Sequence, residues 1–447
     1  MLIVSKFGGT SSADANMLLK IKAFLESNPD RRYAIVSAPG KRHTNDVKMT
    51  NLLRECVFLA KRGESYNSVL NVIESRLKET ISQLGVEYNL TRDFDLLRDA
   101  LKEKACGFEA YVESRGEFFN GKILASLMGW PFVDTKECIR FDKNGFNPYL
   151  SNALVQNILS TKERAVIPGY YGSSTRDGSI RLFSRGGSDI TGAIVAQAVG
   201  ADLYENVTDV DGVFAADPGI VMHAKTIPLM TYQELREMAH GGAGVIHPDA
   251  LLPVKRARIP TRVLHLLHPE GPYTDVISDL EDNRKIRYVG VAAKSGFAVI
   301  TVKNSSMTYG VGFAKRLLQV LVDFDINFEQ MPSSSLDSVS LIINHDQLPG
   351  TVLQNLVEAI KKQCTDDYND DDSVSYTRDG ALVCVIGLGM VGAIGASADI
   401  FVALKDAGVN ISTINQGATE EAILIGIHPL DMDRAVLAIH DRCIAPQ

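Results

Sequence analysis

The stretch Leu2–Ser12, LIVSKFGGTSS, sets the architecture of the N-terminal half of the chain. Leu2–Phe7 is a short run rich in branched apolar residues, which is typical of a buried strand. Gly8–Ser12 reads as a turn, and the periodicity of Met17–Glu26 predicts a helix after it. A strand, a glycine turn and a helix in this order form the first unit of an α/β sheet with helices on its faces.

Strand and helix patterns continue to alternate to about residue 272. Tyr33–Ser37 reads as the second strand, which Ala38-Pro39-Gly40 breaks, and residues 50–106 carry the helical periodicity of an all-helical excursion. This alternation predicts a largely parallel sheet, and hence an α/β domain over residues 1–275. Later elements are expected at Ala165–Pro168, Ile180–Phe183, Gly192–Val199 (a small-residue helix) and Leu203–Val207.

From residue 288 the chain contains an internal repeat. A strand-helix-strand-strand-helix order occurs twice at a spacing of about 85 residues, which predicts two modules, over residues 288–375 and 378–447, that can interleave. The acidic run Thr365–Asp372 between them reads as a solvated linker, with a cation site as the alternative. The repeat elements are Phe297–Val302, Gly312–Phe324, Ile326–Met331, Val339–Ile343 and Thr351–Lys362, then Leu382–Ile386, Gly395–Ala407, Val409–Asn415, Ala422–Ile427 and Met432–Ile439.

Composition excludes several classes of protein. The 447 residues carry 46 basic and 54 acidic side chains, a net charge of −8, which argues against a general binder of nucleic acid or anionic membrane. The six cysteines are scattered without a CxxC pair, so neither a disulfide framework nor a zinc site is expected, and the thiols should be buried and reduced. Without a signal-peptide pattern or an apolar run of membrane-spanning length, a cytoplasmic location is expected.

The first candidate site follows the first strand. Paired glycines at Gly8-Gly9, followed by Thr10 and Ser11, let backbone amides approach a phosphate, and a helix start adds a favourable dipole. Lys6 would place a charge on a transferring phosphoryl group. The plain alternative is a strand-to-helix turn with a snorkelling lysine, and no Walker A pattern is present.

The second candidate site is Phe183–Thr191, where a strand again ends in paired glycines before a helix. Arg185 could clamp a substrate carboxylate through two parallel hydrogen bonds. Asp189 could orient Lys6 or a magnesium ion. The alternative is that Ser188 or Asp189 simply caps the helix, although this does not explain the arginine or the glycine pair.

Five ordered segments together resemble the amino-acid kinase superfamily, and specifically its aspartate kinase branch. They are KFGGTS at Lys6, VSA ending at Ala38, the SxGE turn at Ser114–Glu117, SRGGSD at Arg185, and TDVDGVF at Thr208–Phe214 followed by Ala216-Asp217-Pro218. The resemblance spans nearly the whole chain. It implies a three-layer α/β/α kinase domain followed by two ferredoxin-like βαββαβ ACT domains.

The resemblance also implies residue roles. Lys6 and Asp189 would be catalytic, with Asp189 orienting Lys6 and organising Mg²⁺. The nucleotide-binding set would be Lys6, Gly8, Gly9, Thr10, Ser11, Thr208, Asp209, Phe214 and Asp217. Aspartate would be held by Ser37, Thr50, Glu117, Arg185 and Ser188, with Arg185 on its α-carboxylate and Glu117 on its ammonium group. Thr44 is a rival to Thr50, because extra residues follow Pro39.

Two positions depart from the family pattern. Gly219 stands where many relatives have an arginine, and Gly244 where many have a lysine. The phosphates would then rely on Lys225 or another nearby basic residue, or on magnesium and backbone amides.

The segment Gly387–Gly392 matches GxGxxG literally, but the strand after its helix ends without the acidic residue that a dinucleotide site requires. It instead resembles the effector loop of an ACT domain, and Met307–Phe313 is the matching loop of the first copy. The expected effector-binding residues are Met307, Gly312, Asn327, Glu329 and Ser338. Dimerisation without a ligand is the alternative role.

The resemblance implies transfer of the γ-phosphoryl group of ATP to the L-aspartate side chain, the first step towards lysine, threonine and methionine. Feedback control by lysine or threonine and a homodimer formed through the ACT domains, or a tetramer, are expected with it. The rivals are a sister kinase acting on glutamate, acetylglutamate or a nucleotide, and a sensor that has lost turnover.

Overall fold

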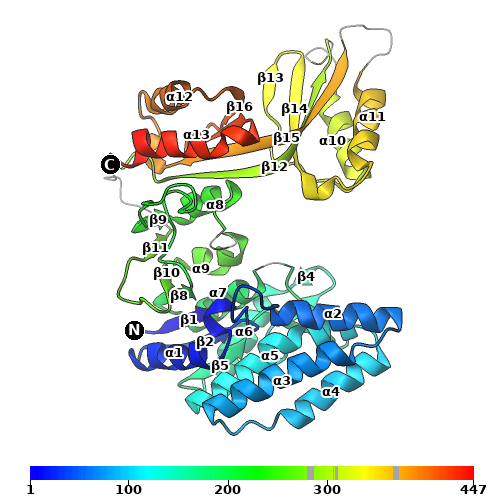
Figure 1. The fold of residues 1–447 in the computed structure, drawn as a ribbon, viewed down its shortest axis with the longest axis vertical. Coiled ribbons are helices and arrows are strands. Elements are labelled where there is room, and N and C mark those ends of the chain that lie inside the picture. The colour runs from blue at the N-terminus through cyan, green and yellow to red at the C-terminus, as the bar shows by residue number, and fades with distance from the viewer. Residues whose placement is uncertain are drawn as a thin grey trace. The chain divides into compact units, whose positions relative to one another are not determined.

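The computed structural model describes all residues except 185, 245, 247, 279–285, 306, 308–310, 366–371 and 447. The chain forms two units (Figure 1). The first contains residues 1–213, 226–236 and 244–281, and the second contains residues 214–225, 237–243 and 282–447.

The first unit is built on a seven-stranded sheet of order β5-β2-β1-β8-β10-β11-β9. The pairs from β5 through β10 are parallel, and only β10 and β11 pair in opposite directions. A smaller sheet has the order β4-β3-β6-β7. The strands are β1 (Ile3–Phe7), β2 (Arg31–Val36), β3 (Arg140–Asp142), β4 (Gly145–Phe146), β5 (Ala165–Pro168), β6 (Tyr171–Ser174), β7 (Ile180–Leu182), β8 (Leu203–Thr208), β9 (Leu229–Thr231), β10 (Thr261–His265) and β11 (Thr274–Ile277).

Helices cover the large sheet, and α1 to α5 share one apolar core with it (Figure 1). Successive side chains of β1 point to opposite faces, so Phe7 packs edge-on against Phe24 of α1 while Lys6 points towards α7. The helices are α1 (Ala15–Glu26), α2 (Met49–Arg62), α3 (Asn67–Leu84), α4 (Leu90–Glu103), α5 (Phe108–Met128), α6 (Pro148–Leu159), α7 (Gly187–Val199), α8 (Tyr232–His240) and α9 (Leu252–Ala257).

The second unit contains a six-stranded antiparallel sheet of order β13-β14-β12-β15-β17-β16. The repeat order is confirmed, and both copies share this sheet because the two long strands β12 and β15 pair from Gly290↔Ile386 to Lys303↔Ser373. The first copy is β12 (Gly290–Lys303), α10 (Phe313–Asp323), β13 (Ser333–Ser335), β14 (Ser338–Asn344) and α11 (Val352–Cys364). The second is β15 (Ser373–Ile386), α12 (Ala396–Asp406), β16 (Ile411–Gln416), β17 (Ala422–Ile427) and α13 (Met432–Ile439).

Matching backbone conformations support the repeat. The first helix of each copy begins after a glycine with positive φ, Gly312 at 90° and Gly395 at 86°. The glycines of the GxGxxG segment serve packing within this unit, since a Cβ on Gly389 would lie 2.1 Å from the carbonyl oxygen of Ile286.

Three expectations about local structure were wrong. The segment Ser114–Glu117, expected as a turn, lies inside α5. Ile326–Met331 is not a strand; β13 begins at Ser333, although Gln330 forms an isolated bridge with Ile342. Cys106 is exposed, whereas the other five cysteines are buried as expected; all six are free thiols.

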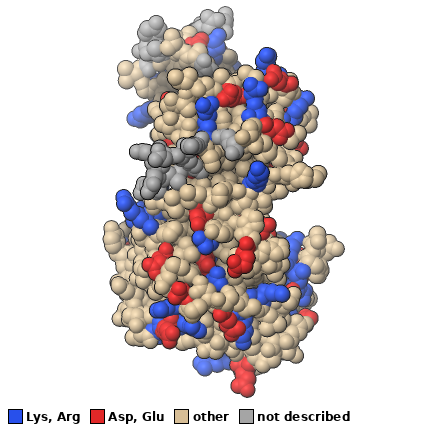
Figure 2. Space-filling view, turned by 90° about the vertical axis from the view of Figure 1, so that its left-hand side faces the viewer, with Lys and Arg blue, Asp and Glu red and all other residues tan. Residues whose placement is uncertain are grey.

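On the face that Figure 2 shows, basic and acidic side chains are interspersed, in keeping with the mixed charge of the sequence. None of the helices in the described part of the chain is both long and apolar enough to cross a membrane.

Candidate active site

The centre of the site is an ion pair at the carboxyl edge of the large sheet. Lys6 of β1 lies in register with Asn206 of β8, so both side chains reach the same point. The Lys6 Nζ lies 2.6 Å from Oδ1 of Asp189, and the Asn206 side-chain amide donates to the same oxygen at 2.7 Å. Only 10% of the Lys6 side chain and 16% of the Asp189 side chain are exposed. The cation is therefore held rigidly by two strands and a helix.

The first turn of α7 brings Ser188 and Asp189 to this point. Gly186 caps the helix with φ of 60°, a left-handed conformation that favours glycine, and no side chain caps the first amides. The alternative prediction from the sequence, that Ser188 or Asp189 only caps this helix, is therefore wrong. Amides without a side-chain cap at a helix N-terminus suit an anion.

The two loops that follow β1 and β2 touch through glycines. The Gly40 amide donates to the Gly9 carbonyl at 2.8 Å, and a Cβ on Gly40 would lie only 2.6 Å from the Gly9 carbonyl carbon. A short 3₁₀ turn at Thr10–Ser12 follows, and α1 begins only at Ala15, with Asp14 as its side-chain cap. Because Asp14 caps α1, the amides at the start of this helix are not available to an anion. Gly9 and Thr10 instead form a tight turn that faces the site.

Glu117 enters the site from α5. Its helix packs closely on the end of β2, since a Cβ on Gly116 would lie 2.7 Å from the Ala38 Cβ, which is why glycine stands there. Glu117 is 4% exposed, and its Oε2 atom has no hydrogen-bond partner among the residues that the structure describes. Burial raises the pKa of this carboxyl to about 8, against the lowering effect of backbone hydrogen bonds and the charges of Arg54 and Arg115. A buried carboxylate oxygen of this kind suits a cationic ligand group.

These groups line one cavity of about 520 Å³ within the first unit. Eight of the residues expected from the sequence lie along it: Lys6, Gly9, Thr10, Ser37, Thr50, Glu117, Ser188 and Asp189. Arg185 lies outside the described residues, although its neighbours Ser184 and Gly186 line the cavity. Thr50 lines the cavity, while its rival Thr44 is exposed and does not.

Sequence reasoning missed other lining residues, notably Lys48, Arg54 and Tyr170. Lys48 caps the start of α2, and Arg54 pairs with Glu113 at 2.9 Å. Both follow the loop after Pro39, and their positions depend on how α2 packs against α5. The only sequence signal for them was their closeness to Thr50.

The remaining nucleotide candidates are not part of this cavity. Gly8 and Ser11 lie beside it without lining it, and Ser11 has a buried hydroxyl without a partner. Thr208 ends β8, which is the neighbour of β1, and its hydroxyl donates to Asp209 at 3.1 Å. Phe214 and Asp217 belong to the second unit, where the Asp217 carboxylate accepts from the Gly219 amide at 2.8 Å.

The effector candidates lie in the second unit. Glu329 lies 3.7 Å from Nε2 of His240, and its amide donates to the Ile342 carbonyl at 2.8 Å. The Asn327 backbone exchanges two hydrogen bonds with the Gln347 side chain. Gly312 starts α10, Ser338 starts β14, and Met307 packs partly buried against the core of the first copy.

The cavity combines a fixed ammonium group, a helix N-terminus with free amides and a carboxylate oxygen facing inward. Such a set can hold a phosphorylated ligand at the Lys6 end and a ligand ammonium at the Glu117 end. The site is suited to transfer of an anionic group between two bound molecules.

Comparison with known proteins gives consistent results. The amino acid kinase family model matches residues 1–265, and an ACT domain model matches residues 383–442. Aspartokinase 3 of Bacillus subtilis is 32% identical over 455 residues, covering 99% of this chain and 98% of that protein. The crystal structure of Clostridium acetobutylicum aspartate kinase has a TM-score of 0.91 at 38% identity, with 99% and 100% coverage. Escherichia coli aspartokinase III in complex with aspartate and ADP has a TM-score of 0.80 at 23% identity, with 99% of each chain covered.

Proposed function

Since this chain belongs to the amino acid kinase family, and within it to the aspartokinases, we propose that it transfers the γ-phosphoryl group of ATP to the side-chain carboxylate of L-aspartate. The observation that carries this proposal is that the Lys6–Asp189 pair and the partner-free Glu117 oxygen line the same cavity. One end of the cavity suits a phosphoryl group, and the other suits the ammonium group of an amino acid. The solved E. coli relative was crystallised with aspartate and ADP, the same two classes of ligand.

The residues of the cavity act by position and charge. The acceptor carboxylate is already an anion at neutral pH, so no general base is required. Lys6 would neutralise charge that develops on the transferring phosphoryl oxygens, and Asp189 keeps its ammonium group in place. Ser37, Thr50, Ser188 and the Arg185 side chain would orient aspartate, with Lys48 and Arg54 adding positive charge near the acceptor.

The site fits Mg²⁺ through Asp189. Lys6 and Asn206 both bind Oδ1, which leaves Oδ2 of this carboxylate without a protein partner among the described residues. A carboxylate oxygen is a ligand that Mg²⁺ prefers, together with substrate phosphates. When bound, the ion would neutralise charge on the phosphates.

We propose that the remaining nucleotide contacts within the first unit come from Gly8, Gly9, Thr10, Ser11, Thr208 and Asp209. The support is that β1 and β8 are adjacent parallel strands, so the turns after Phe7 and Thr208 lie at the same edge of the sheet. Ligands of open α/β sheets bind at the carboxyl edge of their strands. With glycine at 219 and 244, the free amides of α7 and Mg²⁺ would carry more of the phosphate binding.

A hydroxylamine trap tests the reaction. With ATP, Mg²⁺ and L-aspartate, the protein should produce a hydroxamate, because hydroxylamine captures an acyl phosphate. Reactions with glutamate or N-acetylglutamate in place of aspartate serve as matched controls. Hydroxamate from one of these alone would identify a sister kinase, and none from any acceptor would identify a sensor without turnover.

We further propose that the two modules, residues 288–375 and 378–447, bind an amino-acid effector, with lysine favoured over threonine, and join two chains into a dimer. The support for a sensor is that the two modules match. The first helix of each begins after a glycine, and the strands of both form one shared sheet. The preference for lysine rests on Glu329 and Asp337, which would meet a cationic side chain. The free thiols suit a cytoplasmic enzyme.

Regulation gives a direct prediction. Millimolar lysine, or threonine, should inhibit the wild-type enzyme, and Glu329→Ala should weaken inhibition by roughly five- to 150-fold in effector concentration while catalysis persists, the range of typical allosteric coupling. The measurement is initial rate against added lysine, threonine and methionine. His240→Ala is the matched control, since it removes a neighbour 3.7 Å from Glu329 but keeps the Glu329 carboxylate, and it should leave inhibition in place. Lack of inhibition by all three amino acids would leave the modules with a dimerisation role alone.

A further inference from the structure

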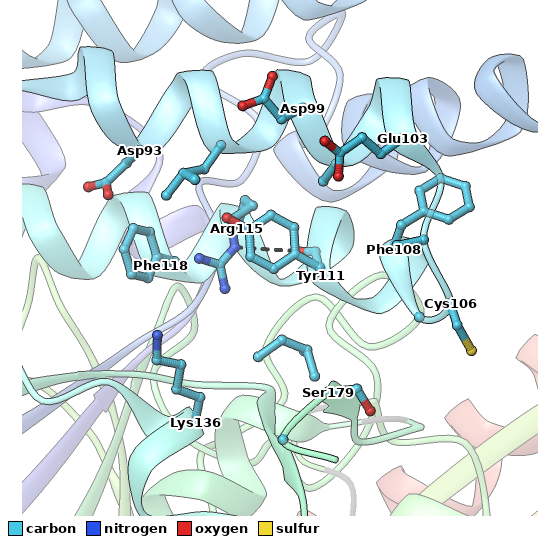
Figure 3. Close-up of a pocket in the computed structure, with 16 residues that line it drawn as sticks. Asp93, Asp99, Glu103, Cys106, Phe108, Tyr111, Arg115, Phe118, Lys136 and Ser179 are labelled. Carbon is cyan, nitrogen blue, oxygen red and sulfur yellow. Dashed lines mark hydrogen bonds between the residues drawn. The ribbon is translucent and has the colours of Figure 1, made fainter.

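A second cavity, of about 650 Å³, lies in the first unit between α4, α5 and the turns near residues 136 and 179 (Figure 3). Arg115 and Glu117 are two positions apart on α5, which places them about 200° apart around the helix. Glu117 therefore faces the active-site cavity while Arg115 lines this second cavity.

Arg115 is a buried cation without an acidic partner. It is 4% exposed, and its guanidinium lies 4.3 Å from the ring centres of both Tyr111 and Phe118. Its Nε atom donates to the Tyr111 carbonyl at 3.2 Å, and its Nη2 atom donates to the Ser114 hydroxyl at 2.9 Å. Within the described part of the chain, no carboxylate lies within 4.0 Å of it and its Nη1 atom has no hydrogen-bond partner.

Other buried arginines of this unit are neutralised. Arg31 binds both carboxylate oxygens of Glu205, at 2.9 and 3.0 Å. Arg76 lies 3.5 Å from Asp46 and donates to backbone carbonyls. A buried charge without an acidic partner is costly, so Arg115 favours an anion from outside the chain.

The rest of the lining restricts that anion. Asp93, Asp99 and Glu103 of α4 line the cavity together with Arg115 and Lys136, so acids outnumber bases. A phosphate dianion would be repelled by three carboxylates. A carboxylate on Arg115 with an ammonium group towards the acids of α4 matches both signs, and the rings of Tyr111 and Phe118 beside Arg115 offer an apolar surface.

We propose that this cavity binds an α-amino acid with an apolar side chain, its carboxylate on Arg115 and its ammonium group towards the acids of α4. The site is distinct from the aspartate site, from which α5 separates it, and from the ACT modules. Its existence does not depend on the phosphoryl-transfer reaction. An Arg–carboxylate pair is directional and suits recognition of a small acid.

Cys106 supplies a readout that is independent of activity. It lines this cavity and is the one exposed cysteine of the six. Iodoacetamide labelling of the full chain, followed by mass spectrometry, should be slowed at least threefold by millimolar L-phenylalanine, L-leucine or L-methionine. Phenethylamine, which has no carboxylate, should give no protection, and phenylacetate, which has no ammonium group, should give less than phenylalanine.

Two variants complete the test. Arg115→Met should abolish the protection, and Leu96→Trp, at a half-exposed lining position, should fill the cavity, slow labelling by itself and remove the response to amino acids. Leu96→Trp keeps the test decisive if Arg115→Met does not fold. Lack of protection by all three amino acids, or protection that persists in Leu96→Trp, would overturn the proposal, and equal protection by phenylacetate would overturn the ammonium assignment.

Discussion

Lys6→Ala should lower kcat by at least a hundredfold. The Lys6 side chain is only 10% exposed and its ammonium group is fixed by Asp189 at 2.6 Å, so it meets the transferring group without reorganising. One preorganised donor to a transition-state oxyanion is worth about 3–4 kcal/mol, and each 1.4 kcal/mol is about tenfold in rate. The measurement is kcat with saturating ATP and aspartate. Lys78→Ala, at a residue on α3 with 65% of its side chain exposed, is the matched control and should be neutral.

The same variant separates two roles for Lys6. If the charge acts in the transition state, kcat falls and the aspartate KM stays within a few-fold of the wild-type value. A raised aspartate KM with unchanged kcat would remove Lys6 from phosphoryl transfer and make it an acceptor-binding residue. Unfolding is a separate outcome, which circular dichroism would reveal, because among the described residues the change leaves the Asp189 carboxylate with Asn206 as its one side-chain partner.

The sequence was sufficient for the order of elements and for much of the site. Lys6, Ser188 and Asp189 lie next to glycines that follow strands, and strand ends meet at one edge of a parallel sheet. The repeat was readable because both copies place a glycine immediately before their first helix. These patterns are local in sequence, so they can be recognised without knowledge of tertiary packing.

What the sequence could not provide depends on packing between distant elements. Gly116 suggested a turn, but it stands in α5 because the helix approaches Ala38 too closely for a side chain. Lys48 and Arg54 line the site only because α2 packs against α5. The segment 326–331 has the composition of a strand, yet only Glu329 and Gln330 bond to β14, and regular pairing begins at Ser333.

The two charged residues of the SRGE segment, Arg115 and Glu117, lie on opposite faces of α5 and line different cavities. Arg115 and Glu117 are both buried, yet neither neutralises the other through a direct contact, since the helix turns them apart. The charge of Arg115 still acts on Glu117 through the protein and lowers its pKa, against the larger effect of burial. The acceptor end of the active site is therefore sensitive to pH.

Glu117→Gln should raise the aspartate KM by about thirtyfold or more, because truncating one side of a buried charge pair costs about 2–5 kcal/mol. The ATP KM should stay within a few-fold. Glu109→Gln, two turns earlier on α5 and paired with Lys61 outside the cavity, is the matched control. An unchanged aspartate KM, or a raised ATP KM instead, would show that Glu117 does not hold the ammonium group.

The pH dependence of the aspartate KM tests the role of Glu117 more specifically than the KM at a single pH. With a pKa of about 8, Glu117 is protonated in the free enzyme at lower pH, and binding of an ammonium group requires its ionised form. Below that pKa each decrease of one pH unit should therefore raise the apparent aspartate KM by about tenfold, and above the pKa the KM should level off. Glu117→Gln cannot ionise, so its KM should stay flat over the same range. A wild-type KM that rises with pH, or a variant that keeps the wild-type slope, would contradict the assignment, because the sign follows from which form of the carboxyl binds the cation.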